Sequence, residues 1–352
     1  MIREGIQKLI EGTDLTFEES EEIMREVMSG NVTNAQTAAF LTTLRMKGES
    51  VEELIAFTSV IRSNCCTIHP KVQGRLVDTC GTGGDKIKTF NISTVAAFVI
   101  AGAGVSVAKH GNRAVTSKSG SADVLEKLGL NINLKPKEVE SIIEKIGVGF
   151  MFAPSFHPAM KYAAETRREI GIRTVFNVLG PLTNPACANA QLLGVYDSKL
   201  VVPMASALDK LGCIEAMVVH GLDGIDEIST IGKTVIAHLK KGIVTKLEFT
   251  PINFGVKTAI KADLQSSTAE ESAEIIFKIL SGRIVDNAKA EIVLVNSAAG
   301  IIVGGKAENF AESMELARKS IASGKAYAKL KELVKASGGS LQRLEELEAK
   351  YE

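Results

Sequence analysis

A chain of 352 residues, 45% hydrophobic and 23% charged, has the length and composition of a globular protein of about two domains. Its 41 Lys and Arg residues balance its 41 Asp and Glu residues, so we expect no global field that recruits nucleic acid or an anionic membrane, and any anion site must be local. The N-terminus lacks the layout of a secretory signal, and the longest uncharged apolar stretch, 95–108, is too short for a membrane span.

The first 65 or so residues have the pattern of a compact helical unit. Apolar residues recur at helical spacing behind three capping boxes, in which a hydroxyl residue precedes Glu or Gln by three positions. The boxes are Thr16–Glu19, Thr33–Gln36 and Ser50–Glu53. Gly30 and Gly48 stand where helix C-termini favour glycine, and we expect the unit to end at the linker 68–75.

After residue 75 short apolar strands alternate with helical stretches, which is typical of an α/β domain with a mainly parallel central sheet. The expected strands are 75–80, 104–109, 148–153, 190–195 and 215–221. The expected helices between them include 121–128, 136–147 and 198–212. The tail, 267–352, is again expected to be helical. The sequence therefore predicts a small all-helical N-terminal domain followed by a large α/β domain.

The sequence GTGGD at 81–85 follows the first expected strand. Glycine lets the chain turn sharply and brings backbone N–H groups against a ligand with no Cβ in the way. A helix that starts near Ser93 would aim its N-terminal N–H groups and the positive end of its dipole at the same point. The spacing matches neither a Rossmann fingerprint nor a P-loop. We interpret the stretch as a phosphate cradle; the alternative is a plain strand-to-helix turn.

The loop after the second expected strand is basic. Lys109, His110, Arg113 and Lys118 lie close together among small and polar neighbours, and no acid occurs from 109 to 122. Cations, hydroxyls and flexible backbone in one place suit a pyrophosphate. We interpret this loop as an anion site, with a solvated basic loop as the alternative, and assign no catalytic role to His110.

Three acids, Asp223, Asp226 and Glu227, follow the expected strand 215–221 in a loop that contains glycine. Carboxylates are hard oxygen ligands suited to Mg²⁺, which keeps waters and shares substrate phosphates. An isolated exposed acidic turn is the alternative. A chain with a phosphate cradle and a basic loop needs such a site to neutralise a diphosphate, which favours the metal interpretation.

The segment 157–185 predicts a helix after Pro158 with Arg167 and Arg168 near its middle, and then a rigid turn at Gly180–Pro181. One of the two arginines, facing a cleft, would clamp a carboxylate in bidentate fashion. Periodicity alone leaves open which one.

The five cysteines give neither a disulfide framework nor a zinc pattern, because their number is odd and their placement scattered. They are Cys65, Cys66, Cys80, Cys187 and Cys213. We interpret Cys80, inside the glycine motif, as a small buried residue. A reducing cytosol is the compartment that fits best.

Taken together, these blocks resemble the anthranilate phosphoribosyltransferase family of the tryptophan pathway. The blocks GTGGD, NIST, KHGNR, SGSADVLEKLG, GPLTNP and DGIDE occur here in that order, and the likeness covers nearly the whole chain. The combination is very specific, although no single block is. One departure is visible, because the family commonly has glycine after Asp85 and this chain has KIK at 86–88.

The resemblance implies a helical domain at 1–72, with returning segments from about 157–185, and an α/β domain of the nucleoside-phosphorylase type at 73–352. It implies a homodimer that is formed through the helical domain. From the cysteines and the balanced charge we expect a cytoplasmic protein that binds neither nucleic acid nor membrane. The ribose donor, phosphoribosyl pyrophosphate (PRPP), is expected in the cleft between the domains.

The resemblance also implies site residues. Those expected to bind PRPP are Gly81, Gly84, Asp85, Thr89, Asn91, Ile92, Ser93, Thr94, Lys109, His110, Gly111, Asn112, Arg113, Ala114, Val115, Thr116, Ser117 and Ser121. Those expected to hold anthranilate are Gly81, Asn112 and Arg167, the last through the carboxylate of the substrate. Those expected to bind Mg²⁺ are Ser93, Asp226 and Glu227.

The implied reaction joins the amino group of anthranilate to C1′ of the ribose and expels pyrophosphate, without a dedicated catalytic base. One rival is a pyrimidine nucleoside phosphorylase on the same scaffold, against which the KHGNR and DGIDE blocks argue. A second rival is a non-catalytic relative that binds nucleic acid. Balanced charge and the presence of both Asn112 and Arg167 argue against that one.

Overall fold

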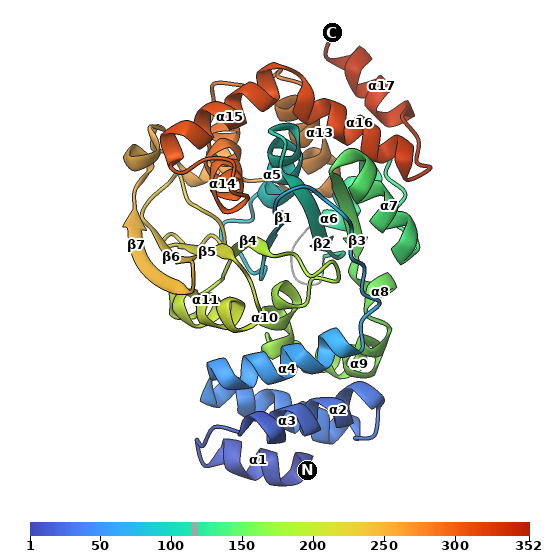
Figure 1. The fold of residues 1–352 in the computed structure, drawn as a ribbon, viewed down its shortest axis with the longest axis vertical. Coiled ribbons are helices and arrows are strands. Elements are labelled where there is room, and N and C mark those ends of the chain that lie inside the picture. Colours follow the sequence, from blue (N-terminus) through green and yellow to red (C-terminus); the bar gives the residue numbers. More distant parts are fainter. Residues whose placement is uncertain (115–118) are drawn as a thin grey trace.

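The computed structural model describes residues 1–114 and 119–352. A bundle of helices lies at one end of the molecule, below a larger α/β part (Figure 1). The bundle contains α1 (Ile2–Ile10), α2 (Phe17–Ser29), α3 (Asn34–Lys47) and α4 (Val51–Ser63). The three capping boxes are confirmed at the starts of α2, α3 and α4, and α2 and α3 end at Gly30 and Gly48.

Among the described residues, seven strands form one sheet with the order β3-β2-β1-β4-β5-β6-β7. The strands are β1 (Leu76–Gly81), β2 (Ser106–Gly111), β3 (Val148–Phe152), β4 (Ala190–Gly194), β5 (Glu215–Gly221), β6 (Thr234–Lys240) and β7 (Ile243–Phe249). The first five are parallel, and each lies within two residues of an expected strand. The antiparallel pair β6 and β7 was not expected from the sequence.

Helices cover both faces of this sheet. The helices between β1 and β4 in the chain are α5 (Ile92–Gly102), α6 (Ser121–Lys127), α7 (Pro136–Ile146), α8 (Ala153–Phe156), η1 (Pro158–Met160), α9 (Lys161–Ile170) and α10 (Val175–Leu182). The helices that follow β4 in the chain are η2 (Ser198–Leu200), α11 (Val201–Lys210), η3 (Pro251–Phe254), α12 (Lys261–Leu264), α13 (Ala269–Leu280), α14 (Ala288–Val303), α15 (Phe310–Ala322), α16 (Lys325–Ala336) and α17 (Gln342–Lys350). The helical tail is therefore confirmed.

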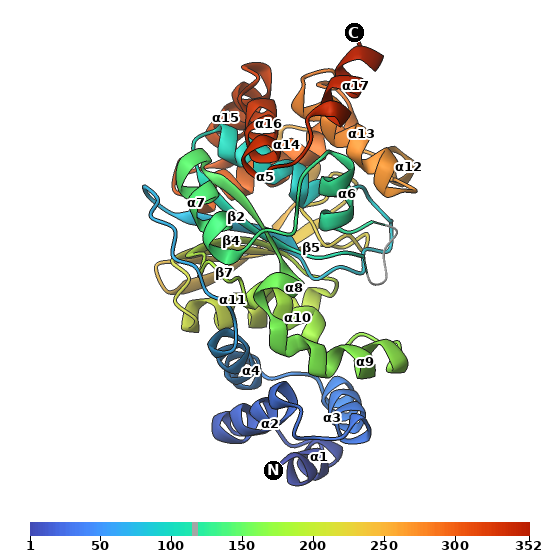
Figure 2. The same ribbon diagram turned by 90° about the vertical axis from the view of Figure 1, so that its right-hand side faces the viewer.

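The two faces of the sheet differ in what covers them. Helices α5, α14, α15 and α16 lie on one face, while α10 and α11 lie on the other, toward the helical bundle (Figure 2). One hydrophobic core runs from the bundle through α10 and α11 to the sheet, and it includes Phe57, Leu182 and Val218. The bundle is thus joined to the sheet by continuous apolar packing, in addition to the linker.

The segment 157–185 packs against the bundle. Helix α9 contacts α2 and α3, and α10 contacts α3 and α4. The predicted rigid turn at Gly180–Pro181 is wrong, because both residues lie inside α10. Pro181 lacks the N–H that would donate to the carbonyl four residues earlier, and α10 ends one residue later, at Leu182.

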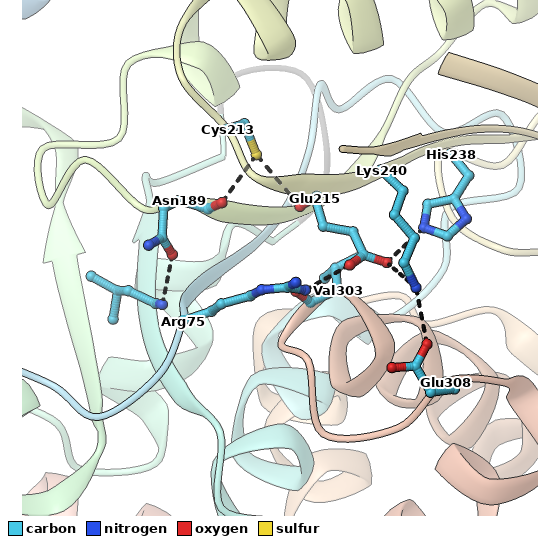
Figure 3. A network of polar contacts seen from close by, with 9 residues as sticks. Arg75, Asn189, Cys213, Glu215, His238, Lys240, Val303 and Glu308 are labelled. Carbon is cyan, nitrogen blue, oxygen red and sulfur yellow. Dashed lines mark hydrogen bonds and ion pairs between the residues drawn. The ribbon is translucent and has the colours of Figure 1, made fainter. Parts of the chain in front are cut away.

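A paired network of charges lies at the amino end of β5 (Figure 3). Glu215 is 1% exposed, and its Oε2 accepts a hydrogen bond of 2.6 Å from Nη1 of Arg75. Its Oε1 accepts one of 2.8 Å from Nε2 of His238 and lies 3.6 Å from Nζ of Lys240. Arg75 also donates to the carbonyl of Val303 at the end of α14. The network therefore connects β5, β6 and the end of α14.

No helix within the described ranges combines the length and the apolar character needed to cross a bilayer.

Candidate active site

Four neighbouring parallel strands end on glycine at the same edge of the sheet: β1 at Gly81, β2 at Gly111, β4 at Gly194 and β5 at Gly221. The acidic loop after β5 folds back across these ends. A Cβ on Gly81 would lie 2.5 Å from Oδ2 of Asp226, and one on Gly194 would overlap the backbone carbonyl of the same residue. The absence of side chains is therefore what lets Asp226 reach the edge of the sheet.

The glycine motif makes a tight loop above this edge. Gly83 and Gly84 have φ values of 72° and 90°, which favour glycine, and the N–H of Gly83 donates to Oδ2 of Asp226 at 2.8 Å. The carboxylate of Asp85 turns inward and accepts from the N–H of Ile87 at 2.6 Å and from the N–H of Thr89 at 2.8 Å. Asp85 thus fixes the loop internally.

The amino end of α5 meets both the acids and the basic strand. The N–H of Ser93 donates to Oε1 of Glu227 at 3.2 Å. Nζ of Lys109, which is 4% exposed, donates to the carbonyl of Thr79 at 2.6 Å and to Oγ of Ser93 at 3.3 Å. The glycine loop, the amino end of α5, Lys109 and the acids Asp226 and Glu227 therefore lie against one another.

The acids at this point carry raised pKa values. Burial, followed by the charge of Asp85, raises the pKa of Asp226 to about 6. Burial and the neighbouring Asp226 raise the pKa of Glu227 well above its usual range. Burial lowers the pKa of Lys109. Two crowded carboxylates, neither paired with a described basic side chain within 4 Å, favour a site for a cation.

The donor set suits a hard divalent ion. It offers two carboxylates and the hydroxyl of Ser93, and no cluster of three or more His, Cys, Asp or Glu side chains occurs in the described part of the chain. Mg²⁺ binds proteins through one or two carboxylates and completes its shell with waters and substrate phosphates. The residues present therefore fit Mg²⁺ better than a metal that requires a complete protein cage. The third expected acid, Asp223, accepts from the hydroxyl of Ser229.

The basic loop is only partly described. The backbone carbonyl of Asn112 accepts from the N–H of Ala122 at 3.2 Å and the hydroxyl of Ser121 at 3.4 Å, which places Asn112 against the start of α6. Arg113 pairs with Asp123 at 3.1 Å and with Glu126. Its charge is therefore partly neutralised. The predicted contacts Val115, Thr116 and Ser117, together with Lys118, lie outside the described residues.

The other predicted contacts surround the same region. Oδ1 of Asn91 accepts from the hydroxyls of Ser272 at 2.8 Å and Ser119 at 3.1 Å, which ties the start of α5 to α13. Ile92 and Thr94 are buried within α5. Thr89 closes the glycine loop and Ala114 donates its N–H to Asp123 at 3.0 Å.

A cavity of about 460 Å³ opens beside the point of convergence. The predicted residues Gly81, His110, Gly111, Asn112 and Arg167 line it. Of the two arginines on α9, Arg167 faces the cavity and lies over the ring of Phe176, 5.0 Å from its centroid, whereas Arg168 is exposed. The structure thereby answers which arginine faces a cleft.

Sequence reasoning missed several residues that line the cavity. They include His157, Phe176, Asn177 and Ile61. The ring centroids of His157 and His110 are 5.0 Å apart, and burial lowers their pKa values to about 4 and about 3. Both rings are therefore neutral near pH 7. A histidine directly before Pro158 was the only local signal for the first of them.

Comparisons with known proteins agree on one family. A family model described as "Glycosyl transferase family, a/b domain" matches residues 73–327, and one described as "Glycosyl transferase family, helical bundle domain" matches residues 3–65. The anthranilate phosphoribosyltransferase of Methanocorpusculum labreanum is 52% identical over 96% of this chain and 99% of its own length. That of Alkaliphilus metalliredigens is 49% identical over 96% and 98%.

Solved structures of the same enzyme have the same fold. The crystal structure from Thermus thermophilus has a TM-score of 0.89 and 40% identity, and the match covers 95% of this chain and 99% of that one. The enzyme from Saccharomyces cerevisiae in complex with PRPP and Mg has a TM-score of 0.87 and 28% identity, with 96% and 98% covered. The predicted fold class is confirmed.

Proposed function

Because the chain belongs to the anthranilate phosphoribosyltransferase family, we infer that it transfers the phosphoribosyl group of PRPP to the amino nitrogen of anthranilate and uses Mg²⁺. The products are N-(5-phosphoribosyl)anthranilate and pyrophosphate. The structural observation that carries this inference is the convergence of Lys109, Ser93 and the pair Asp226–Glu227 beside a cavity that contains Arg167.

We propose that the diphosphate of PRPP binds where α5 begins, against the glycine loop and Lys109. The helix dipole and the N-terminal N–H groups of α5 favour negative charge there. Nζ of Lys109 is already held by the carbonyl of Thr79, so its charge is positioned before the ligand arrives. We propose that the predicted contacts among the described residues, along 84–94 and 110–114 and at Ser121, extend this surface around the ribose phosphate.

Ser93, Asp226 and Glu227 are proposed to hold the Mg²⁺. The ion neutralises charge on the diphosphate and favours its departure. The shared burial of the two carboxyls, which raises their pKa values, is what makes a cation favourable at this place.

Anthranilate is proposed to occupy the cavity, with its carboxylate on Arg167 and its ring beside Gly81 and Asn112. Arg167 lies over the Phe176 ring and forms no ion pair with a described acid, so its guanidinium is available for a carboxylate. No general base is required, because the aromatic amine already carries the attacking lone pair.

The chemistry follows from these positions. Breaking the C1′–O bond builds positive charge on the ribose and negative charge on pyrophosphate, as in glycosidic cleavage. The nitrogen of anthranilate forms the bond to C1′ as the C1′–O bond to pyrophosphate breaks, and the new ammonium then loses one proton to water. The protein supplies orientation and charge stabilisation for these events, and no side chain forms a covalent intermediate.

The test is an assay that follows the fluorescence of anthranilate in the presence of PRPP and Mg²⁺. We expect the signal to fall with PRPP and Mg²⁺ together and to stay constant when either is omitted. Consumption of a pyrimidine nucleoside and phosphate, with no loss of anthranilate, would instead identify the phosphorylase of the same scaffold.

We further propose a domain division at 1–72 and 73–352, with 157–185 returning to the helical domain, and a cytoplasmic homodimer formed through that domain. The family supports the dimer, and the exposed Met46 of α3, at 82%, gives a position at which to test it. Five free cysteines favour a reducing compartment. Sedimentation of the wild-type protein and of Met46→Glu tests the dimer; equal monomeric mass for both would contradict it.

A further inference from the structure

Arg173, which none of the sequence motifs singled out, contacts the backbone of the glycine loop. It lies in the connection between α9 and α10 and is half-buried. Its Nη2 donates a hydrogen bond of 3.0 Å to the carbonyl oxygen of Gly84. The guanidinium is so close to the α-carbon of Gly84 that a Cβ there would overlap it. Glycine at position 84 therefore admits the arginine as well as the turn.

The side chain of Arg173 is itself held in place by Tyr196. The guanidinium lies 4.8 Å from the centroid of the Tyr196 ring, at stacking distance. Tyr196 follows β4, and its N–H donates to Oγ1 of Thr82 at 3.0 Å. Arg45 of α3 approaches the same ring at 5.6 Å and donates to its hydroxyl at 3.0 Å. Tyr196 thus joins the glycine loop, α3 and Arg173.

The peptide that Arg173 holds has a second polar group. The carbonyl of Gly84 and the N–H of Asp85 belong to one planar trans peptide, so they point in opposite directions. The N–H of Asp85 donates to none of the described residues. Holding the carbonyl fixes the direction of that N–H, and a charged donor on the carbonyl also polarises the amide and strengthens the N–H as a donor.

We propose that Arg173 is a positioning residue for PRPP: by binding the Gly84 carbonyl it directs the N–H of Asp85 toward the diphosphate. This inference rests on the proposed function, because it takes the glycine loop as the diphosphate site. Arg173 follows Arg167 on the same segment, so it also connects the PRPP loop to the helix that carries the proposed anthranilate contact.

The test compares Arg173→Ala, Arg173→Lys and Tyr196→Leu with the wild-type protein. Arg168→Ala, an exposed arginine on the same segment, is the matched control. For Arg173→Ala we expect the Kd of PRPP with Mg²⁺, measured by calorimetry, to rise about tenfold or more, since the Gly84–Asp85 peptide is then no longer held in place and must be ordered when PRPP binds. Lysine keeps the charge but neither the stacking nor the fork, and Tyr196→Leu removes the support, so both should raise the Kd by a smaller factor.

The readouts separate positioning from general stability. We expect the anthranilate KM and the thermal midpoint to stay near the wild-type values in the three variants, while the PRPP KM follows the PRPP Kd. A folded Arg173→Ala protein with an unchanged PRPP Kd, or with PRPP and anthranilate KM values raised by the same factor, overturns the proposal. If Arg173→Ala does not fold, unchanged PRPP affinity in both Arg173→Lys and Tyr196→Leu does so.

A failure of the proposed function can be distinguished from a failure of the Arg173 proposal. A wild-type protein that binds PRPP but consumes no anthranilate would contradict the reaction, while the PRPP affinities of the variants would still decide the role of Arg173. A wild-type protein that gives no heat with PRPP and Mg²⁺ overturns both.

Discussion

The two ends of β5 place buried carboxylates in opposite settings. At the amino end, Glu215 is 1% exposed and is paired with Arg75 and His238 (Figure 3). At the carboxyl end, Asp226 and Glu227 are 8% and 7% exposed and form no ion pair with a described residue. The depth is similar and only the pairing differs. Paired charge indicates a structural role, whereas crowded unpaired charge indicates a place kept for a ligand or an ion.

The arginines repeat this contrast. Arg75 donates to Glu215 and to the carbonyl of Val303, so its hydrogen-bonding groups serve the fold. Arg167 faces the cavity over Phe176, burial lowers its pKa, and no described acid lies within ion-pair distance of it. The following variants test whether the contrast separates stability from activity.

The largest effect is expected from replacing the unpaired acids. Asp226→Asn combined with Glu227→Gln should lower kcat by on the order of a thousandfold, because the carboxylates proposed to hold the metal are gone. The thermal midpoint should not fall, since burying these two charges costs stability. Steady-state kinetics at saturating Mg²⁺ measures the first, and thermal unfolding without Mg²⁺, which would stabilise only the wild type, measures the second. Near-normal turnover would remove the acids from the metal site.

The paired acid should show the reverse behaviour. Glu215→Gln leaves Arg75 without its charged partner and should lower the free energy of unfolding by about 2–3 kcal/mol, as for the loss of a hydrogen bond between charged groups, with kcat within about twofold of wild type. Glu308→Gln is the matched control, because Glu308 pairs with Lys240 but its side chain is 85% exposed. Denaturant titration compares the two. A loss of activity in folded Glu215→Gln would break the contrast between the ends of β5.

The unpaired arginine should affect one substrate. Arg167→Ala should raise the anthranilate KM by about tenfold to a hundredfold, as expected for the loss of a charged hydrogen bond, and leave the PRPP KM nearly constant. Arg168→Ala, its exposed neighbour, should change neither. Initial rates with each substrate varied in turn give the answer. An anthranilate KM equal to that of wild type would exclude Arg167 from the cavity contact.

The smallest effect concerns pH. The pKa of Asp226 is about 6, so protons compete with Mg²⁺ for this carboxylate below that pH. The Kd of Mg²⁺–PRPP should therefore rise by up to about tenfold per pH unit below pH 6. Because the pKa of Asp226 is raised above that of an ordinary aspartate, its protonation stabilises the folded state. This contribution to the free energy of unfolding is full below about pH 4 and is lost as pH rises through about 6. Calorimetry between pH 5 and 8 measures the first, and a flat profile would contradict it.

Local sequence patterns predicted most of the helices and strands. Capping boxes predicted the starts of α2, α3 and α4, and the five parallel strands were found because apolar runs alternated with helical stretches. The hairpin of β6 and β7 was missed. Its two-residue connection is Lys241–Gly242, with φ values of 52° and 76°. Lysine seldom adopts positive φ, so the dipeptide gave no turn signal in the sequence.

The site was predictable in outline but not in its contacts. Each cluster stands directly after an expected strand, and parallel strands bring such positions to one edge. Which arginine of α9 faces the cavity depends on how α9 packs against α2 and α3, which no local pattern records. The contact of Arg173 with Gly84 joins residues 89 positions apart in the chain and likewise required the folded structure.

Gly194, at the end of β4, determines where the acidic loop lies without contributing a charged group itself. A methyl group at Gly194 would act as a wedge beneath the acidic loop, since it overlaps the carbonyl of Asp226. Gly194→Ala would thus push both acids away while leaving every ionisable group of the chain in the sequence. The variant would keep every proposed site residue, yet we expect it to lose activity because the two carboxylates no longer face the amino end of α5.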